Sequence, residues 1–349
     1  MNDHKWISDA DSDLELFKEL FNKNGSSRTI EHLKWQYVES CSEKGRLILS
    51  GFDDSSNSLT GVYALFQSRF ICDSKELIGS QSLDTLVAPE SRGKGLFNKF
   101  ACEVYGEAAD RDVAFVYGFP NGSSAHGFFN KLSWKKLDPV PFIILPINSN
   151  YILSRLPLIK KISRFIPNFS YLKKIKNINN LIFSENVKID SKYDALWSEF
   201  SKKIKFGINR DSQYVNWRLA RPDEEYKNLV VFDSNDKMIA ICFYTLKNKH
   251  GGSIGYILDL LYLDDGVGAV LLNQVLKEFK EKNCDAVLAW NFEHSPNHTA
   301  YKNNGFFSLP EKIRPIELHF GVRVFNENIE ATLTDRSAWY LSYFDSDSV

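Results

Sequence analysis

The sequence predicts an α+β protein of two similar domains, each a mixed, mostly antiparallel sheet flanked by helices. The first observation behind this prediction is a short apolar strand that runs at once into a glycine-rich loop and an amphipathic helix, over residues 83–100. The second is that a similar succession of helix, hairpin, strand, glycine-containing loop and helix recurs in the second half of the chain. A length of 349 residues is sufficient for two domains of ordinary size.

The overall composition favours well-packed cores and argues against several classes of protein. Hydrophobic residues make up 43% of the chain and aromatic residues 14%, which is too much for a disordered protein. Because the formal net charge is −1, we expect no nucleic-acid partner. We find neither an apolar run long enough to span a bilayer nor the apolar core of a signal peptide at the N-terminus, and therefore expect a cytoplasmic protein.

The cysteines also favour a cytoplasmic protein. The five cysteines are odd in number and scattered, which fits reduced, buried thiols better than a disulfide framework. Since the cysteines and histidines show none of the usual spacings of metal ligands, we expect no metal site.

The apolar pattern predicts the elements of the first domain in order. Two helices come first, and the face of the first one is apolar at the helical spacing. A polar turn at residues 53–57 then joins two β-favouring runs into a hairpin. The predicted elements are helices over 11–21 and 29–37, strands over 46–52, 60–70, 76–81 and 83–87, a helix from 96, a strand over 113–117, a helix over 123–132 and a last strand over 134–145.

The loop between the strand and helix of residues 83–100 predicts an anion site. The strand ends at Pro89, which cannot donate to a ladder, and the helix starts just after Gly95. A helix N-terminus offers unpaired N–H groups and the positive end of the helix dipole. Two glycines allow close approach of the backbone, and Arg92 and Lys94 add positive charge. We expect a phosphate or pyrophosphate ligand.

The loop lacks the residues of two common phosphate motifs. A Walker loop needs Ser or Thr after its lysine, where Gly95 stands, and a dinucleotide fingerprint needs a third glycine where Asn98 stands. The stretch from Val87 to Leu96 instead resembles the acetyl-CoA loop of the GNAT superfamily of N-acetyltransferases, Val-x-Pro-x-x-Arg-Gly-x-Gly-Leu/Ile. Element order extends this resemblance over about residues 1–146.

The resemblance implies acetyl-CoA as cofactor and assigns roles to single residues. Main-chain groups of Leu86 and Val87 are expected to contact the pantetheine arm, and Asn121 either this arm or the acetyl end. The residues implied to hold the pyrophosphate are Arg92, Gly93, Lys94, Gly95 and Leu96. In the second GNAT motif, Asn121, Ala125 and Phe129 fill the first three places, but Phe129 stands where many members have a tyrosine that protonates the leaving thiolate.

The catalytic residues are predicted with alternatives. Direct transfer requires a base for the acceptor amine and an acid for the thiolate. Asp84, the carboxylate on the strand beside the thioester, is a candidate base, although Asp259 occupies the same place in the second half and suggests a structural hydrogen bond. His126 is a candidate at the start of a helix, where a cap or surface role is the alternative. Tyr117 is a candidate acid, with a place in the core as the alternative.

A basic amphipathic segment follows the first domain. Residues 139–184 contain neither Asp nor Glu and carry seven cations, Arg155, Lys160, Lys161, Arg164, Lys173, Lys174 and Lys176. Such a segment can lie on an anionic membrane, which predicts peripheral contact through residues 151–176 at the inner face of the membrane. The alternative is a connecting segment whose apolar face packs between two domains.

The second half keeps the glycines of the loop, Gly266 and Gly268, but has Asp264 and Asp265 in place of the cations. Two carboxylates would repel a pyrophosphate, so we expect a degenerate GNAT-like copy that has lost the cofactor. The predicted domains are residues 1–146, which bind acetyl-CoA, the linker 147–190, the degenerate domain 191–326 and a tail at 327–349.

These observations lead to an acetyl-CoA-dependent N-acetyltransferase that acts on a small-molecule primary amine. The turn Phe119-Pro120-Asn121 and the tandem layout resemble transferases of surface-polysaccharide synthesis, which suggests an amino sugar or sugar nucleotide as acceptor. The alternative is a non-catalytic scaffold that binds CoA or docks on a membrane. A peptidoglycan transferase that uses aminoacyl-tRNA is a weaker alternative, because such enzymes lack the Arg-Gly-x-Gly loop.

Overall fold

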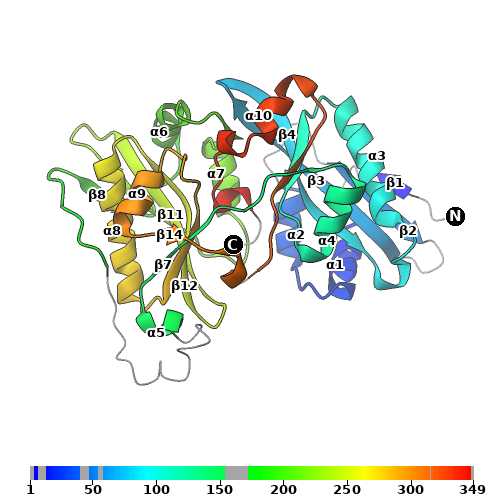
Figure 1. Ribbon diagram of the computed structural model, residues 1–349, viewed down its shortest axis with the longest axis horizontal. Helices are drawn as coiled ribbons and strands as arrows, with labels where there is room; N and C mark the ends of the chain where they lie inside the picture. The colour runs from blue at the N-terminus through cyan, green and yellow to red at the C-terminus, as the bar shows by residue number, and fades with distance from the viewer. Residues whose placement is uncertain are drawn as a thin grey trace. The chain divides into compact units, whose positions relative to one another are not determined.

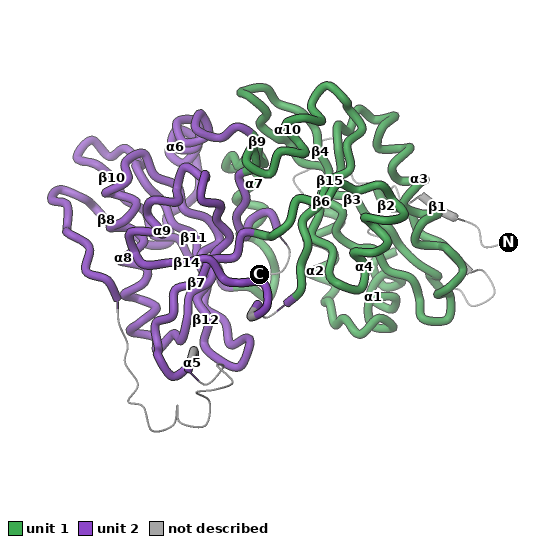
Figure 2. The backbone as a smooth tube through the Cα atoms, in the orientation of Figure 1, with its two compact units in different colours: residues 1–140, 206–224, 317–339 green, residues 141–205, 225–316, 340–349 purple. Residues whose placement is uncertain are grey.

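The computed structural model describes residues 4–6, 13–39, 47–53, 58–153, 172–314 and 316–346. The chain divides into two compact units (Figure 2), which we describe one at a time. Unit 1 comprises residues 1–140, 206–224 and 317–339, and unit 2 comprises residues 141–205, 225–316 and 340–349. Both units are therefore assembled from segments that lie far apart in the sequence.

Unit 1 is built on one eight-stranded sheet (Figure 1). Every strand pair in it is antiparallel except β4–β5, which is parallel. In spatial order the strands are β1 (His4–Trp6), β2 (Leu47–Asp53), β3 (Ser58–Cys72), β4 (Lys75–Val87), β5 (Phe115–Gly118), β15 (Gly321–Val324) and β6 (Lys135–Lys136), with β9 (Phe206–Ile208) paired to β3.

Helices cover both faces of this sheet, and successive side chains of β3 point to opposite faces and pack against different helices. Val62 and Ala64 pack in the cluster formed with α1 (Leu14–Lys23) and α2 (Ile30–Tyr37), whereas Tyr63 and Leu65 pack in the cluster formed with α3 (Leu96–Asp110). The other α-helices of unit 1 are α4 (Gly122–His126), α7 (Ser212–Leu219) and α10 (Glu330–Thr334).

Unit 2 repeats this plan with a seven-stranded sheet (Figure 1). Again one central pair, β12–β13, is parallel and the other pairs are antiparallel. The strands in spatial order are β14 (Phe307–Ser308), β7 (Phe142–Pro146), β13 (Ala286–Trp290), β12 (Gly252–Tyr262), β11 (Met238–Lys249), β10 (Lys227–Phe232) and β8 (Ile182–Glu185). The α-helices are α5 (Ser149–Leu153), α6 (Ser191–Ser201), α8 (Asp265–Glu281) and α9 (His298–Asn304).

Each sheet includes strands from the other half of the sequence. Strand β15 follows the second half along the chain, yet it lies between β5 and β6, while β7 leaves the first half to lie between β13 and β14. The single strand expected over residues 134–145 is therefore wrong. It is divided into β6 and β7, which belong to different sheets, and Pro139 and Pro141 between them lack the N–H that a continuous strand needs.

The domain boundaries expected from the sequence follow the chain linearly, whereas the compact units interleave. The linear division remains a prediction about the repeats. Most of the basic segment, residues 154–171, lies outside the described residues. In the part of the chain that the structure describes, we find no helix whose length and apolar character would let it cross a membrane.

Candidate functional site

A β-bulge marks the strand β4 where the sequence analysis expects the reacting end of the cofactor. Tyr63 pairs with Thr85 but Leu65 pairs with Ser82, so two residues of β4, Leu83 and Asp84, lie opposite a single residue of β3. The parallel ladder of β4 with β5 consists of the pairs at Ser80 and Gln81. The two strands separate beyond this point, which leaves main-chain groups of β4 available to a ligand.

The glycine loop follows β4 and turns the chain into α3. Gly93 and Gly95 adopt φ values of 78° and 74°, in the left-handed region that favours glycine. An added Cβ at either residue would have nothing within 4 Å, so the conformation, and not a lack of space, requires glycine. Gly95 is the N-cap residue of α3 and has no side chain to accept hydrogen bonds from the first turn. Those N–H groups are open to an anionic ligand.

The start of α4 faces this loop. The Asn121 side chain caps α4, because its Oδ1 atom accepts hydrogen bonds from the backbone N–H groups of Ser123 and Ser124, both at 3.1 Å. Gly127 lets α4 approach α3, since an added Cβ there would lie 2.7 Å from the Phe97 ring. The chain then continues as one π-helical turn, Gly127–Lys131, an irregularity that is frequent at functional sites.

These elements enclose a pocket of about 720 Å³ within unit 1. It is lined by the end of β4, the glycine loop, the first turn of α3 and the start of α4. Its lining residues are Asn24, Thr85, Leu86, Val87, Ser91, Arg92, Gly93, Gly95, Leu96, Phe97, Asn98, Asn121, Ser123, Ser124, Gly127 and Lys131. Of the residues that the sequence analysis assigns to cofactor binding, Lys94 alone does not line this pocket.

Several pocket residues were not predicted from the sequence. Lys131 supplies a cation from the π turn, and Asn24 comes from the end of α1. Asn24 also accepts a 2.7 Å hydrogen bond from the Arg92 guanidinium. A polar residue after an amphipathic helix is too common a signal to identify Asn24, and Lys131 resembles any surface lysine.

Asp84 lies buried on the other face of β4, towards α2. One of its carboxylate oxygens accepts hydrogen bonds from Arg28 at 2.8 Å and from Gln36 and Tyr37 at 2.5 Å each. An acceptor amine that approached this oxygen would have to displace one of these donors. In unit 2, Asp259 also lies at a bulge, where Phe243 pairs with Asp259 and Tyr244 with Ile257.

The environment of Asp259 is similar to that of Asp84. Asp259 is fully buried and accepts a 2.7 Å hydrogen bond from the Tyr340 hydroxyl. Since both sheets place a bonded aspartate at the bulge, this position has a structural role in each unit, whatever else Asp84 does.

The two remaining catalytic candidates are not among the residues that line the pocket. His126 is exposed at the end of α4, with Nδ1 2.8 Å from the Asn130 amide nitrogen. Tyr117 is 1% exposed and packs against the rings of Phe70, Phe119 and Trp339. His126 nevertheless lies between the lining residues Ser124 and Gly127 along the chain, whereas Tyr117 belongs to the core.

An Asp–His pair, which the sequence analysis missed, flanks the start of α4. His319 Nδ1 lies 2.5 Å from an Asp138 carboxylate oxygen, and the Phe320 N–H donates to the other oxygen at 2.6 Å. Burial opposes the charged form of Asp138, but hydrogen bonds from His319, the Phe320 N–H and Lys136 hold its pKa below the ordinary value. Since 181 residues separate His319 from Asp138, local sequence patterns could not reveal the pair.

Main-chain contacts hold His319 close to the pocket wall. The His319 N–H donates to the Pro120 carbonyl at 2.9 Å, and Leu318 forms a β-bridge with Asn121, which lines the pocket. The imidazole ring lies against Phe129, with 6.0 Å between ring centroids. The place that many GNAT members fill with a tyrosine thus has an ionisable side chain beside it.

The corresponding helix start in unit 2 differs in one respect. Asp264, the residue before α8, accepts hydrogen bonds through Oδ1 from the N–H groups of Gly266 at 2.9 Å and Val267 at 3.1 Å. The chain's own carboxylate therefore occupies the position of an anion at α8, while the first turn of α3 has no such cap.

Comparisons by sequence and by structure differ in outcome. No protein-family model matches the sequence, and no curated protein is similar to it in sequence. Among solved structures, a GCN5-related N-acetyltransferase from Anabaena variabilis matches with a TM-score of 0.66 at 13% identity, over 93% of this chain and 73% of that chain. A probable N-acyltransferase from Enterococcus faecalis matches with a TM-score of 0.63 at 11% identity, with the same coverage of both chains.

A third similar structure is an N-myristoyltransferase from Saccharomyces cerevisiae with bound myristoyl-CoA. Its TM-score is 0.58 at 12% identity, over 92% of this chain and 79% of that chain. At such identities the likeness concerns the fold alone. Because each match spans both units, the chain has the two-sheet fold of GCN5-related N-acyltransferases.

Proposed function

We propose that this protein is an acyl-CoA-dependent N-acyltransferase whose cofactor binds in the pocket of unit 1. The observation that carries the proposal is the coincidence, in one pocket, of an uncapped helix start, two left-handed glycines and the unpaired edge of β4. Solved structures of the same fold, including those with bound myristoyl-CoA, support the assignment.

The residues present fit the chemistry of an acyl-CoA. The N–H groups of the first turn of α3, together with Arg92 and Lys131, are suited to a pyrophosphate, since all are donors and two are cationic. Lys94 would add charge from the same loop. Main-chain groups of Leu86 and Val87 would align the pantetheine arm, and the Asn121 side chain would fix its far end. When bound, the cofactor supplies the activated thioester.

The acyl group and the acceptor are proposed in finer detail. We propose acetyl-CoA as the donor, because the loop resembles that of acetyl-CoA enzymes. The proposed acceptor is a primary amine on an amino sugar or sugar nucleotide of surface-polysaccharide synthesis, on the strength of the Phe119-Pro120-Asn121 turn and the tandem layout. Membrane contact through residues 151–176 is a separate proposal, supported by the basic composition of that segment.

Two side chains beside the pocket are candidates for the base that removes a proton from the amine. Asp84 lies on β4 but is engaged by three donors, whereas His319 is oriented by Asp138 next to the strand that leads to Asn121. An imidazole whose Nδ1–H donates to a carboxylate presents Nε2 as the basic atom. In the structure this Nε2 lies 3.2 Å from the exposed Glu317 carboxylate, which an acceptor would displace.

Single variants separate these candidates. If His319 accepts the proton, His319→Gln lowers kcat by about 100-fold or more and removes the acidic limb of the pH–rate profile, with CoA affinity unchanged. Asp84→Asn with an unchanged pH profile would assign Asp84 to structure. A changed pH profile in Asp84→Asn, with an unchanged profile in His319→Gln, would assign the base to Asp84. The other predicted catalytic residues, His126 and Tyr117, are tested in the same series.

The alternative function is a non-catalytic scaffold that binds CoA. Phe129, which cannot donate a proton, favours this alternative, as does the absence of Tyr117 and His126 from the residues that line the pocket. Release of free thiol from acetyl-CoA, measured with a panel of amino sugars, sugar nucleotides, polyamines and peptides, distinguishes the two. Turnover with any of these amines supports the enzyme, and tight CoA binding without turnover supports the scaffold.

A matched pair of variants tests the pocket itself. Arg92→Ala should weaken CoA binding about 10- to 100-fold, the usual effect of losing a charge-assisted hydrogen bond. Arg111→Ala is the control, because Arg111 follows the opposite end of α3 and pairs with Glu107 on the surface. Equal affinities of the two variants would contradict the assignment of this pocket.

A further inference from the structure

An apolar and basic surface lies at the outer edge of the sheet in unit 2, and the proposed acyl transfer makes no use of it. Five large apolar side chains are strongly exposed among the described residues, and three of them occur in one short stretch. These are Ile178, Ile182 and Phe183, with exposed fractions of 39%, 53% and 39%. Single exposed apolar side chains are ordinary, but a group of them marks an interaction site.

Strand β8 carries two of these side chains at the edge of the sheet. In the described part of the chain β8 pairs on one side, with β10, so its other side is an open edge. Ile182 and Phe183 are consecutive and therefore point to opposite faces of the strand. Two of the four side chains of β8 are thus apolar and exposed, whereas open edges usually carry charges or are covered.

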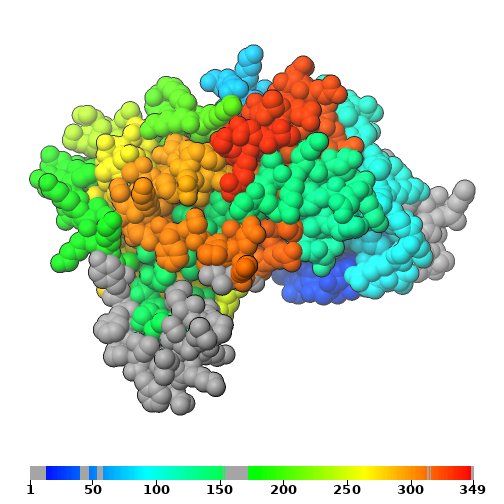
Figure 3. Space-filling view, in the orientation of Figure 1, coloured from blue at the N-terminus to red at the C-terminus, as the bar shows by residue number. Residues whose placement is uncertain are grey.

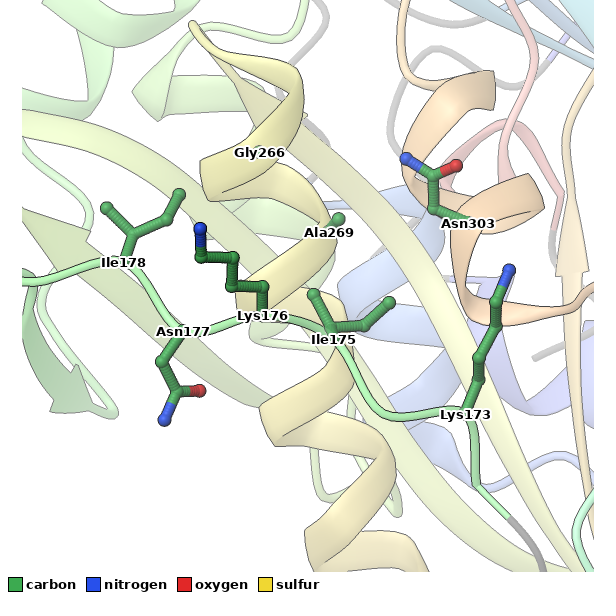
Figure 4. Close-up of a pocket in the computed structure, with 8 residues that line it drawn as sticks. All are labelled: Lys173, Ile175, Lys176, Asn177, Ile178, Gly266, Ala269 and Asn303. Atoms are coloured by element: carbon green, nitrogen blue, oxygen red, sulfur yellow. The ribbon is translucent and has the colours of Figure 1, made fainter.

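The segment before β8 is held on helix α8. The Asn273 side chain donates a 2.9 Å hydrogen bond to the Lys173 carbonyl. Two hollows, of about 550 and 280 Å³, flank this segment and share Ile175, Asn177 and Ile178 as lining residues. Figure 4 shows Lys176 and Ile178 side by side next to the first turn of α8 at Gly266. This segment thus presents both cationic and apolar side chains beside α8.

The charge of this surface is positive. Lys173, Lys176 and Lys277 are exposed around the apolar side chains, and Lys277 lines the same hollow as Ile178 and Phe183. Two exposed acidic residues lie at the margins, Glu185 at the end of β8 and Asp265 at the start of α8. Asp264 is engaged as the cap of α8. We name Lys173, Lys176, Ile178, Ile182, Phe183 and Lys277 the basic edge surface.

We propose that the basic edge surface docks unit 2 on an anionic lipid membrane. Aliphatic and aromatic side chains enter the interfacial region of a bilayer, and lysines beside them bind anionic headgroups. The stretch of residues 172–185 is seen in green at the left margin of Figure 3, on the surface of unit 2. The proposal concerns described residues on β8, on α8 and in the segment that precedes β8, and it is independent of the acyl transfer.

Flotation of the full chain with vesicles tests the proposal. The protein should float with vesicles of phosphatidylglycerol and phosphatidylcholine, but not with phosphatidylcholine alone, and high salt should weaken the binding. Replacing Lys173, Lys176 and Lys277 by Gln should lower the partition coefficient about fivefold for each lysine.

A triple variant, Ile178→Ser, Ile182→Ser and Phe183→Ser, should lower the partition coefficient by at least about tenfold. The control is Phe307→Ser with Ile316→Ser. Phe307 is 50% exposed on β14, the strand at the opposite edge of the same sheet, and Ile316 is the fifth exposed side chain. Unchanged circular dichroism and unchanged CoA affinity show that each variant is folded.

Three results would overturn the proposal. The first is equal vesicle binding by the triple variant and its control. The second is binding that survives these changes but is lost when Arg155, Lys160, Lys161 and Arg164 are replaced by Gln, because the contact would then lie in the preceding segment. The third is absence of binding to anionic vesicles, including the case in which the protein binds RNA or another protein through this surface.

Discussion

At the scale of single residues, glycine conformation distinguishes the loop before α3 from the helix itself. Gly95 has a positive φ and open space around the position of a Cβ, whereas Gly106 lies in the middle of α3, also with open space around it. Alanine is strained at the first position and favourable at the second, since helix interiors prefer alanine to glycine.

We therefore predict opposite effects of two substitutions on one helix. Gly95→Ala should lower the free energy of unfolding by about 1–2 kcal/mol, and Gly106→Ala should raise it by about 0.5–1 kcal/mol. Urea denaturation of both variants measures this difference. A stabilising Gly95→Ala substitution would show that the loop does not need the left-handed conformation.

A second prediction at this scale concerns pH. His32 hydrogen-bonds Gln36 in the group around Asp84, and burial together with the nearby Arg28 and Arg221 lowers its pKa to about 4. The unfolded chain binds a proton at His32 below about pH 6.5, while the folded chain stays neutral down to about pH 4. The unfolded state thus binds more protons in this window, and stability falls as the pH falls through it.

The loss should amount to about 1 kcal/mol, well under the full linkage value because His32 is partly exposed. Urea denaturation between pH 7 and about pH 4.5 measures it, and His32→Gln should remove this part of the pH dependence. His126→Gln, at an exposed position, is the control. An unchanged pH dependence in His32→Gln would contradict the prediction.

At the scale of elements, α3 and α8 occupy corresponding places in the two units, but their N-terminal ends differ. Gly95 leaves the first turn of α3 open, whereas the Asp264 carboxylate accepts two N–H groups at the start of α8. The same local geometry is open in unit 1 and closed by a side-chain cap in unit 2. The sequence already indicated that the two loops differ in charge, because Asp264 and Asp265 stand where the first loop has Arg92 and Lys94.

Asp264 should therefore act as a stabilising cap. Asp264→Ala should lower the free energy of unfolding by about 1 kcal/mol, while Asp264→Asn, which keeps a good capping side chain, should restore most of it. Glu281→Ala, at the opposite end of the same helix, is the control and should change little. Thermal or urea denaturation of the full chain monitors the change. Equal stability of Asp264→Ala and Asp264→Asn would show that the cap contributes nothing.

At the scale of the whole molecule, residues that lie far apart in the sequence make reciprocal contacts. Trp35 and Trp217 stack within unit 1 with 4.9 Å between ring centroids, and each indole N–H donates to the backbone carbonyl of the other residue. The exchange of β7 and β15 between the sheets has the same reciprocal character.

Local features could be predicted and long-range pairing could not. The strand, loop and helix of residues 83–100 follow from apolar spacing, Pro89 and the glycines, and seven of the eight predicted cofactor residues line one pocket. The exchanged strands and the pair Asp138–His319 depend on which distant segments meet, and short-range patterns carry no such information. For Asp84, sequence gives the position, but its engagement by Arg28, Gln36 and Tyr37 is a property of packing.

The most direct test of the whole account is the stoichiometry of acetyl-CoA binding to the full chain, measured by isothermal titration calorimetry. An open helix start in unit 1 and a capped one in unit 2 predict one molecule of acetyl-CoA per chain, with binding weakened about 10- to 100-fold in Arg92→Ala and unchanged in Asp265→Ala. Two molecules per chain, or a loss of binding in Asp265→Ala equal to that in Arg92→Ala, would contradict the assignment of a single working site to unit 1.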